Sequence, residues 1–351
     1  MHVLIVRLGA LGDVVHALPV AAAIRRQFPH ARIDWAIDER YAALLELTPV
    51  IDRRMVLQTR TRPAAAAWLE LRRELRRVGY DVALDVQGLG KSALVAWLSG
   101  AQRVVGFAAP FLRERWAGWL YGEFADPGQP RHVVERNLGI LNALGTEHRE
   151  WEFPIEIRVP AVAEGVRRRL ALMGDRYAVI NPNAAWPAKR WPPARYGAVA
   201  AHVARAHGLP SVVIWGPGDE ERAAAVVAAS EGAATLAPET SLAELAVVLH
   251  GGALVVSGDS GPLHLAAALR TPVVGLYGPS DPARNGPWSR DDRVVSASAD
   301  CACAARRARI GPEGRVPRHC DAPARCLDAI AVGPVCDAVD RRLGGAPAGH
   351  A

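Results

Sequence analysis

The chain has 351 residues, enough for two domains, because a single hydrophobic core rarely grows beyond about 250–300 residues. Half of the residues are hydrophobic, 22% are charged and the net charge of +6 comes almost wholly from arginine, a composition ordinary for a soluble globular enzyme. No stretch reaches the ~20 apolar residues of a membrane span, and the apolar run before Gly9 is too short for a signal peptide, so we expect a cytoplasmic protein.

The first half of the chain alternates short apolar runs with helix-like segments. The runs typical of β-strands are 2–7, 32–37, 81–86 and 103–107, and the helix-like segments are 14–28, 63–78 and 91–98. Pro19 would remove a hydrogen bond from the interior of the first helix, so this helix either kinks or begins late. The alternation predicts βαβ units and a parallel sheet covered on both faces.

A second series of the same kind follows a stretch with prolines and mixed charge, which is typical of a linker. Its expected strands are 177–182, 211–216, 253–259 and 271–278, with helices near 193–206, 219–230, 241–250 and 261–269. We therefore predict an α/β fold of two Rossmann-like domains facing across a cleft. The expected parts are an N-terminal domain 1–155, a linker 156–175, a C-terminal domain 176–342 and a disordered tail 343–351.

Ligands of open α/β sheets bind beyond the carboxyl ends of the strands, and two loops of the second series are suited to a phosphate. In GDSGPLH, residues 258–264, Ser260 can cap a helix, Gly261 permits close approach of a ligand, and His264 lies one turn further on. By itself this stretch is better explained as a capped helix with a structural histidine. The loop 181–193 carries Lys189, one of only two lysines, whose ammonium could neutralise a phosphate, whereas Arg190 is expected to be a solvated surface charge.

The stretch VRLGALGDVVHALP, residues 6–19, resembles a dinucleotide-binding fingerprint but has only two glycines, Gly9 and Gly12, the second followed at once by Asp13. A helix start favours an anion, so Asp13 can cap the helix, for about 1 kcal/mol, or act as a general base, and both roles are compatible. The missing phosphate cradle argues against a nucleotide-dependent dehydrogenase.

Together, VRLGALGDVVHALP, DVALDVQGLGKSAL, the Lys189 loop, WGPGDEERA and VVSGDSGPLHLAAALRTPVVGLYGPSDP resemble the ADP-heptose:lipopolysaccharide heptosyltransferase family. These are inverting glycosyltransferases of the GT-B fold, and IDWAIDERYA and RHVVERNLGIL are most similar to heptosyltransferase I. The resemblance implies transfer of heptose from ADP-heptose to a Kdo residue of lipid A-Kdo in lipopolysaccharide inner-core synthesis. It implies no metal and no cofactor.

The resemblance also assigns roles to individual residues. Asp13 would be the catalytic base, and Lys189 would contact the donor phosphates as ADP leaves. The residues implied around ADP-heptose are Asp259, Ser260, Gly261, Pro262 and His264, with Thr240 and one of Glu220 or Glu221 near the nucleoside. Ala184 and Ala185 depart from the hydroxyl residues that family members can carry in the Lys189 loop.

The acceptor in such a reaction carries phosphates and carboxylates on a membrane-embedded lipid. The candidate residues for binding it are Arg60, Arg62, Gln87, Lys91, Arg113, His132 and Arg136. The segment 107–122 mixes aromatic and charged residues, and it either rests on the membrane as an interfacial helix or packs against the protein. We expect a peripheral enzyme at the inner face of the inner membrane, with no nucleic-acid partner.

Other functions are compatible with the same fold. One is heptosyltransferase II, another is a sugar-nucleotide epimerase, and a third is a nucleotide-binding protein without enzymatic activity. The five cysteines are expected to be free thiols, with a local metal site or disulfide as the alternative; they are Cys301, Cys303, Cys320, Cys326 and Cys336.

Overall fold

The computed structural model describes residues 1–146, 150–157, 166, 168, 176–299, 301–302 and 326–344. The chain divides into two compact units, with the boundary between Glu156 and Ile157. Most of the predicted linker 156–175 and of the predicted tail 343–351 lies outside the described residues. Residues 343 and 344 belong to the last helix, which ends at Gly344.

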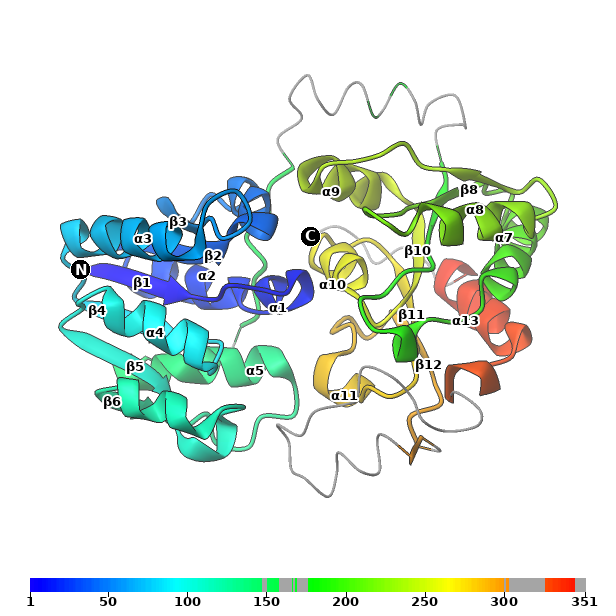
Figure 1. Cartoon of the computed structure of the whole chain (residues 1–351). Helices are drawn as coiled ribbons and strands as arrows, with labels where there is room; N and C mark the ends of the chain where they lie inside the picture. Colours follow the sequence, from blue (N-terminus) through cyan, green and yellow to red (C-terminus); the bar gives the residue numbers. More distant parts are fainter. Residues whose placement is uncertain are drawn as a thin grey trace. The chain divides into compact units, whose positions relative to one another are not determined.

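The first unit is a six-stranded parallel sheet in the order β3-β2-β1-β4-β5-β6 (Figure 1). Its strands are β1 (His2–Val6), β2 (Arg32–Asp38), β3 (Arg53–Leu57), β4 (Val82–Asp85), β5 (Arg103–Phe107) and β6 (Glu123–Ala125). Its helices are α1 (Leu11–Val15), α2 (Leu18–Gln27), α3 (Ala64–Val78), α4 (Gly90–Leu98) and α5 (Val133–Leu138), with 3-10 segments η1 (Glu39–Leu47), η2 (Ala109–Phe111), η3 (Arg115–Leu120) and η4 (Gly139–Leu144).

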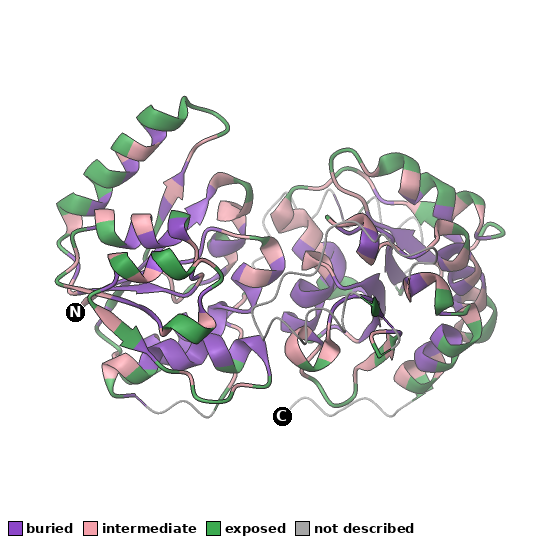
Figure 2. Ribbon diagram, turned by 60° about the horizontal axis from the view of Figure 1, so that its bottom comes forward, coloured by how far each residue is buried: buried purple, intermediate pink, exposed green. Residues whose placement is uncertain are grey.

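Helices cover both faces of this sheet, α3 and α4 on one and α2 and α5 on the other. The central strand β1 is fully buried from Val3 to Val6, as its continuous apolar run predicts (Figure 2). The helix expected at 14–28 is broken into α1 and α2, and Pro19 lies in the first turn of α2, where its missing N–H costs nothing. Of the two outcomes expected from Pro19, a kink or a late start, the structure shows an interruption: α1 ends at Val15 and a second helix begins at Leu18.

The second unit repeats this arrangement with the strand order β12-β11-β10-β7-β8-β9. Its strands are β7 (Ala178–Asn181), β8 (Ser211–Val213), β9 (Ala234–Leu236), β10 (Leu254–Gly258), β11 (Val273–Tyr277) and β12 (Arg293–Ser296). Its main helices are α7 (Pro193–His207), α8 (Glu220–Ala228), α9 (Leu242–Gly251), α10 (Gly261–Ala268), α11 (Pro282–Asn285) and α13 (Val332–Gly344), with 3-10 segments η5 (Pro187–Lys189) and η6 (Cys326–Ala329).

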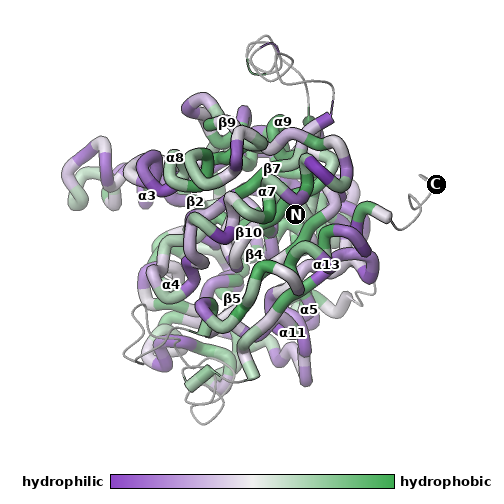
Figure 3. The backbone as a smooth tube through the Cα atoms, turned by 90° about the vertical axis from the view of Figure 1, so that its right-hand side faces the viewer, coloured by the Kyte–Doolittle hydropathy of each residue, from purple (hydrophilic) through white to green (hydrophobic). Residues whose placement is uncertain are grey.

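Helices α7, α8 and α13 lie on one face of the second sheet, and α9 and α10 contact each other on the other face. Within the first unit, strand β5 is largely hydrophobic, whereas helix α3 is largely hydrophilic (Figure 3). The predicted α/β class and the two parallel sheets are confirmed. Among the described residues, no helix combines the length and the apolar character needed to cross a bilayer.

Candidate functional site

Each sheet has one point at which the strand order reverses, between β1 and β4 in the first unit and between β7 and β10 in the second. In parallel sheets, the loops that leave the strands at this point diverge and open a ligand-binding crevice. Asp13 and Gln87 follow β1 and β4, and Lys189 and Asp259 follow β7 and β10. The principal predicted site residues therefore lie at the two reversal points.

Asp259 is the centre of the second unit's site. It is 5% exposed, and its carboxylate forms an ion pair with the Lys189 ammonium. Its Oδ1 lies 3.0 Å from His264 Nε2 and accepts a hydrogen bond from Asn285 Nδ2 at 2.8 Å. The sequence placed Asp259, Lys189 and His264 together around a donor, and within this unit the three do converge.

The ionisation state of Asp259 follows from these partners. Burial by itself would raise the pKa of this carboxyl, but Lys189 and His264 outweigh it and hold the pKa well below its ordinary value. Asp259 is therefore an anion at neutral pH and fixes the Lys189 ammonium, which also lies 4.9 Å from the centre of the Trp186 ring.

Ser260 precedes α10, yet its side chain does not cap the helix as expected. Its hydroxyl instead accepts a hydrogen bond from Asn181 Nδ2 at 2.9 Å and lies 3.0 Å from the Ser257 hydroxyl. Because the Ser260 side chain does not cap α10, the backbone N–H of Gly261 at the start of the helix is left to interact with an anion, whereas Pro262 has no N–H to offer.

The end of the Lys189 loop is held by the last part of the chain. Trp191 is fully buried, and its Nε1 donates to the Ile330 carbonyl at 3.0 Å. Arg195 at the start of α7 donates to the carbonyls of Asp328 and Ile330, at 2.7 and 2.6 Å. The segment before α13 therefore braces the loop that positions the ammonium.

The residues expected near a nucleoside lie on neighbouring loops. Glu220 and Glu221 are exposed in the first turn of α8, after β8, and Thr240 precedes Ser241, the N-cap residue of α9. Arg190 differs from its expected role as a solvated charge. Its guanidinium donates to the Ala184 carbonyl at 2.8 Å and lies 3.6 Å from Asp219, so it anchors the Lys189 loop to the start of α8.

In the first unit, Asp13 has both a structural role and an exposed face. Its Oδ2 accepts a hydrogen bond from the Ala10 backbone N–H at 3.3 Å, which is the capping role considered from the sequence. Its Oδ1 lies 3.0 Å from Arg7 Nη2, and the Asp13 side chain is 34% exposed while that of Arg7 is 4% exposed. The buried guanidinium of Arg7 thus orients the Asp13 carboxylate, which remains partly accessible to solvent.

Two side chains join the loops after β1 and β4. Arg7 donates to the Val86 carbonyl at 2.9 Å, and Gln87 accepts from the Leu8 N–H at 2.7 Å through Oε1. Asp85, at the end of β4, accepts hydrogen bonds from Tyr121 and Ser92 at 2.6 and 2.8 Å. Its burial raises its pKa despite these donors.

Four of the predicted acceptor-binding cations are exposed at the strand ends. Arg60 and Arg62 follow β3, where Arg62 pairs with Glu70, and Lys91 lies in the first turn of α4, 3.9 Å from Asp38. Arg113 follows β5. Burial is the main reason why the pKa of Arg7 is lowered, and the positive charge of Arg113 lowers it further, so Arg113 lies near the Arg7–Asp13 pair.

His132 and Arg136 follow β6 but are buried. His132 Nδ1 accepts from the Val134 N–H at 3.2 Å and so caps α5. The Arg136 guanidinium donates to the Phe111 carbonyl at 2.8 Å and lies 4.8 Å from the centre of the Phe107 ring. In this conformation both side chains stabilise the first unit rather than face solvent.

The segment 107–122 is not the single interfacial helix considered from the sequence, because only the short segments η2 and η3 form in it. Trp116 and Trp119 are 50% and 87% exposed, and Phe124 is 56% exposed. We refer to Trp116, Trp119 and Phe124 as the aromatic surface. It adjoins the exposed Arg113 and Arg115 in sequence.

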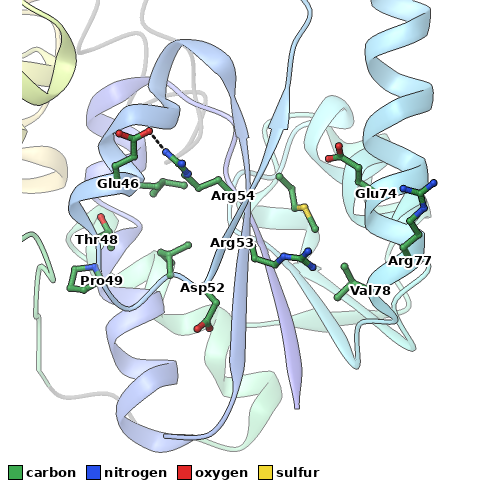
Figure 4. A pocket seen from close by; sticks show the side chains of 12 residues that line it. Glu46, Thr48, Pro49, Asp52, Arg53, Arg54, Glu74, Arg77 and Val78 are labelled. Atoms are coloured by element: carbon green, nitrogen blue, oxygen red, sulfur yellow. Dashed lines mark hydrogen bonds and ion pairs between the residues drawn. The ribbon is translucent and has the colours of Figure 1, made fainter.

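A hollow of about 910 Å³ lies away from these residues (Figure 4). It is formed by the loop that enters β3, by β3 itself and by the end of α3, and it is lined by charged residues such as Glu46 and Arg54, which pair with each other. The loop enters β3 at the amino end of the strand. The hollow therefore lies at the amino ends of the strands, whereas Asp13 lies at their carboxyl ends.

The cysteines do not form a site among the described residues. Cys301 and Cys336 are buried free thiols, as the sequence favoured, and Cys326 is partly buried. Cys303 and Cys320 lie outside the described residues.

Sequence reasoning missed three side chains that organise the two sites. Arg7 reads as the end of a strand, although it directly precedes the Gly-rich turn. Asn181 closes β7 in the same way, and Asn285 lies 26 residues from the Asp259 that it contacts. A polar residue at the end of an apolar strand was the available signal for the first two.

Comparisons with known proteins agree with this geometry. Residues 68–312 match the family described as glycosyltransferase family 9 (heptosyltransferase). The chain is 32% identical over 312 residues to lipopolysaccharide heptosyltransferase 1 of Pseudomonas aeruginosa, covering 86% of this chain and 85% of the relative. It is 29% identical over 305 residues to the protein of the same name from Escherichia coli K12, covering 85% and 94%.

Among solved structures, the chain is similar to the E. coli heptosyltransferase WaaC with ADP, with a TM-score of 0.77 and 26% identity over 97% of this chain and 100% of that one. The family match covers more than half of the chain, and the fold and the sequence relatives agree with it. The chain therefore belongs to glycosyltransferase family 9, the heptosyltransferase family, and is a glycosyltransferase.

Proposed function

We propose that this glycosyltransferase transfers heptose from ADP-heptose to a Kdo residue of lipid A-Kdo, with inversion at the anomeric carbon. The observation that carries the proposal is the similarity to lipopolysaccharide heptosyltransferase 1 along most of the chain. The relatives do not favour heptosyltransferase II, the epimerase or the non-enzymatic alternative.

The donor would bind at the reversal point of the second sheet. The diphosphate of ADP-heptose needs positive charge, which Lys189 and the uncapped start of α10 supply. Asp259 fixes the direction of Lys189, and Thr240 with Glu220 or Glu221 would contact the nucleoside. As the glycosidic bond to ADP breaks, negative charge grows on the departing phosphate, and these fixed positive groups stabilise it.

The acceptor would bind at the reversal point of the first sheet. Asp13 takes the proton of the attacking Kdo hydroxyl, the new bond forms on the face of the heptose opposite to ADP, and ADP leaves with the bonding electrons. Arg7 pairs with the Asp13 carboxylate and holds it directed to solvent before the reaction. The proposal requires Asp13 of the first unit to reach a donor held by the second.

The first unit would also contact the lipid that carries the acceptor. Arg60, Arg62, Lys91 and Arg113 are exposed cations suited to the phosphates and carboxylates of lipid A-Kdo. The aromatic surface offers Trp119, which is 87% exposed, to the interfacial region of a bilayer. Together they support a peripheral location at the inner face of the inner membrane.

Mass spectrometry of lipid A-Kdo after incubation with ADP-heptose and the purified protein tests the proposal. We expect the acceptor to gain the mass of one heptose and ADP to be released in equal amount. If donor binding is measurable but the mass of the acceptor does not change, the proposed transfer is wrong. An altered heptose stereoisomer without transfer would instead assign the epimerase activity.

A further inference from the structure

A cluster of three possible metal ligands lies outside the residues assigned to sugar transfer. It consists of His202 and His207 on α7 and Asp340 on α13. The Nε2 atoms of the two imidazoles lie 2.8 and 2.7 Å from the same oxygen, Asp340 Oδ1, and the ligand atoms of the three residues all lie within 4.8 Å of one another.

The packing of two helices brings these residues together. Helices α7 and α13 lie side by side (Figure 1), and they share a core that includes Val199 and Val203 of α7 and Val335 and Val339 of α13. His202 and His207 are five residues apart on α7. They reach the same atom because His207 is the last helical residue, followed by Gly208 in the left-handed conformation.

The cluster is distant from the donor-binding residues. Lys189 lies just before the start of α7 and His207 at its end, and a helix of 15 residues is about 22 Å long. The cluster therefore lies toward the opposite edge of the second sheet, where it contacts none of the residues assigned to ADP-heptose.

Two neutral imidazoles and one carboxylate are a preferred ligand set for zinc, which binds nitrogen at about 2.0–2.1 Å and takes four ligands. Around a tetrahedral ion the ligand atoms lie about 3.3 Å apart, so the present Nε2–Oδ1 separations need to widen by about 0.6 Å. The side chains are 27%, 21% and 45% exposed, for His202, His207 and Asp340 respectively, which leaves solvent access for a water as fourth ligand.

The charges around the cluster are mixed. Arg205 forms an ion pair with Glu231 at 2.9 Å and Arg342 one with Asp292 at 3.0 Å, whereas Arg341, directly after Asp340, is exposed. Asp337 lies one turn before Asp340 on α13 and adds a negative charge near the cluster. We propose that His202, His207 and Asp340 bind one zinc ion that fastens α13 to α7.

Such an ion would be structural. It would join the chain's last helix to the body of the second unit, and because the unfolded chain lacks the arrangement, bound zinc would stabilise the fold. It would take no part in sugar transfer, so this inference does not depend on the proposed function.

Calorimetric titration of zinc chloride into the full-length, chelator-treated protein, prepared without a histidine tag, tests the site. We expect one ion per chain and an increase of several degrees in the melting temperature. His202→Gln and Asp340→Asn should each weaken zinc binding by at least tenfold and remove that increase. His250→Gln, which changes an exposed histidine at the end of α9, is the matched control and should bind zinc as the wild type does.

Cobalt spectra distinguish this site from the cysteines. We expect d–d bands of a four-coordinate ion without the charge-transfer band of a cobalt–thiolate bond, and the same spectrum in Cys336→Ser. Absence of zinc binding, binding that survives both His202→Gln and Asp340→Asn, or a thiolate band would each overturn the proposal. Circular dichroism of each variant in chelator confirms folding, and either of the two cluster variants suffices for the test.

Discussion

The two units have the same strand order but opposite electrostatics at the point where that order reverses. Asp85 and Asp259 follow equivalent strands, β4 and β10, and both are buried. Neutral donors surround Asp85, whose pKa is raised by burial, whereas Lys189 and His264 outweigh burial at Asp259 and lower its pKa. At the reversal point of the first unit, the partly exposed carboxylate is instead Asp13, on the loop after β1.

Under the proposed function, this difference lets one topology serve two halves of a reaction. The first unit leaves a carboxylate accessible, as a proton acceptor requires. In the second unit, the Asp259 carboxylate pairs with the Lys189 ammonium and so fixes the position of a positive charge, as the binding of a diphosphate requires.

Asp13→Asn should reduce the rate of heptose transfer by about 10²–10⁴-fold, because the amide cannot accept the proton of the acceptor hydroxyl. The dissociation constant for ADP-heptose should stay unchanged, since the donor is assigned to the second unit. Asp52→Asn, which alters another arginine-paired carboxylate of the first unit, is the control and should transfer normally. Loss of donor binding in Asp13→Asn would contradict the division between the units.

Lys189→Met should weaken donor binding and also destabilise the second unit by about 3–5 kcal/mol, because Asp259 would remain buried without its cation. Urea unfolding measures the stability. The double variant Lys189→Met with Asp259→Asn should recover much of the stability but not the donor affinity. If the single variant unfolds like the wild type, Asp259 is compensated by His264 and Asn285 without the lysine.

Trp119→Ser should reduce binding to vesicles containing anionic lipid several-fold, because it removes the most exposed aromatic side chain of the aromatic surface. Flotation of vesicles with bound protein gives the measurement. Transfer to a short, detergent-free acceptor analogue should be unaffected. Equal flotation of wild type and variant would show that the aromatic surface does not face the membrane.

Lowering the pH should destabilise the second unit relative to the first. We expect this effect to be smaller than those of the three substitutions above. Asp259 has a lowered folded pKa, so its contribution is present above about pH 4 and is lost as the pH falls through that folded value. Asp85 has a raised folded pKa, so its contribution is present below about pH 4 and is lost as the pH rises through its folded value. As the pH is lowered from 5 to 3, hydrogen exchange should therefore show amide protection decreasing first around β10. Asp85→Asn should reduce the pH dependence of amide protection around β4.

The sequence predicted the central strands and helices because their apolar runs are long and uninterrupted. It did not predict the strands β3, β6, β9 and β12. The strands β6 and β9 have three residues each, and β3 and β12 begin with arginine. These strands lie at or next to the edges of the sheets, where one side needs no hydrogen-bonding partner and polar residues are tolerated, so their periodicity is weak.

The sequence predicted which loops form the candidate site, but not which side chains contact one another there. Strand ends of a parallel sheet share one edge, so Lys189, Asp259 and His264 could be grouped from their positions alone. Whether a side chain faces solvent or its own core depends on packing. That is why Arg113 is exposed as expected while Arg136, also expected at the acceptor site, lies over the Phe107 ring. The partner of Asp13, Arg7, was hidden for the same reason.

The contacts of Trp191 and Arg195 with the carbonyls of residues 328 and 330 have a consequence for biosynthesis. The lysine-bearing loop is synthesised well before the backbone that holds it. A nascent chain therefore cannot complete the proposed donor site until this later segment has left the ribosome. Messages truncated before this segment should yield polypeptides that lack donor affinity even where the second sheet has formed.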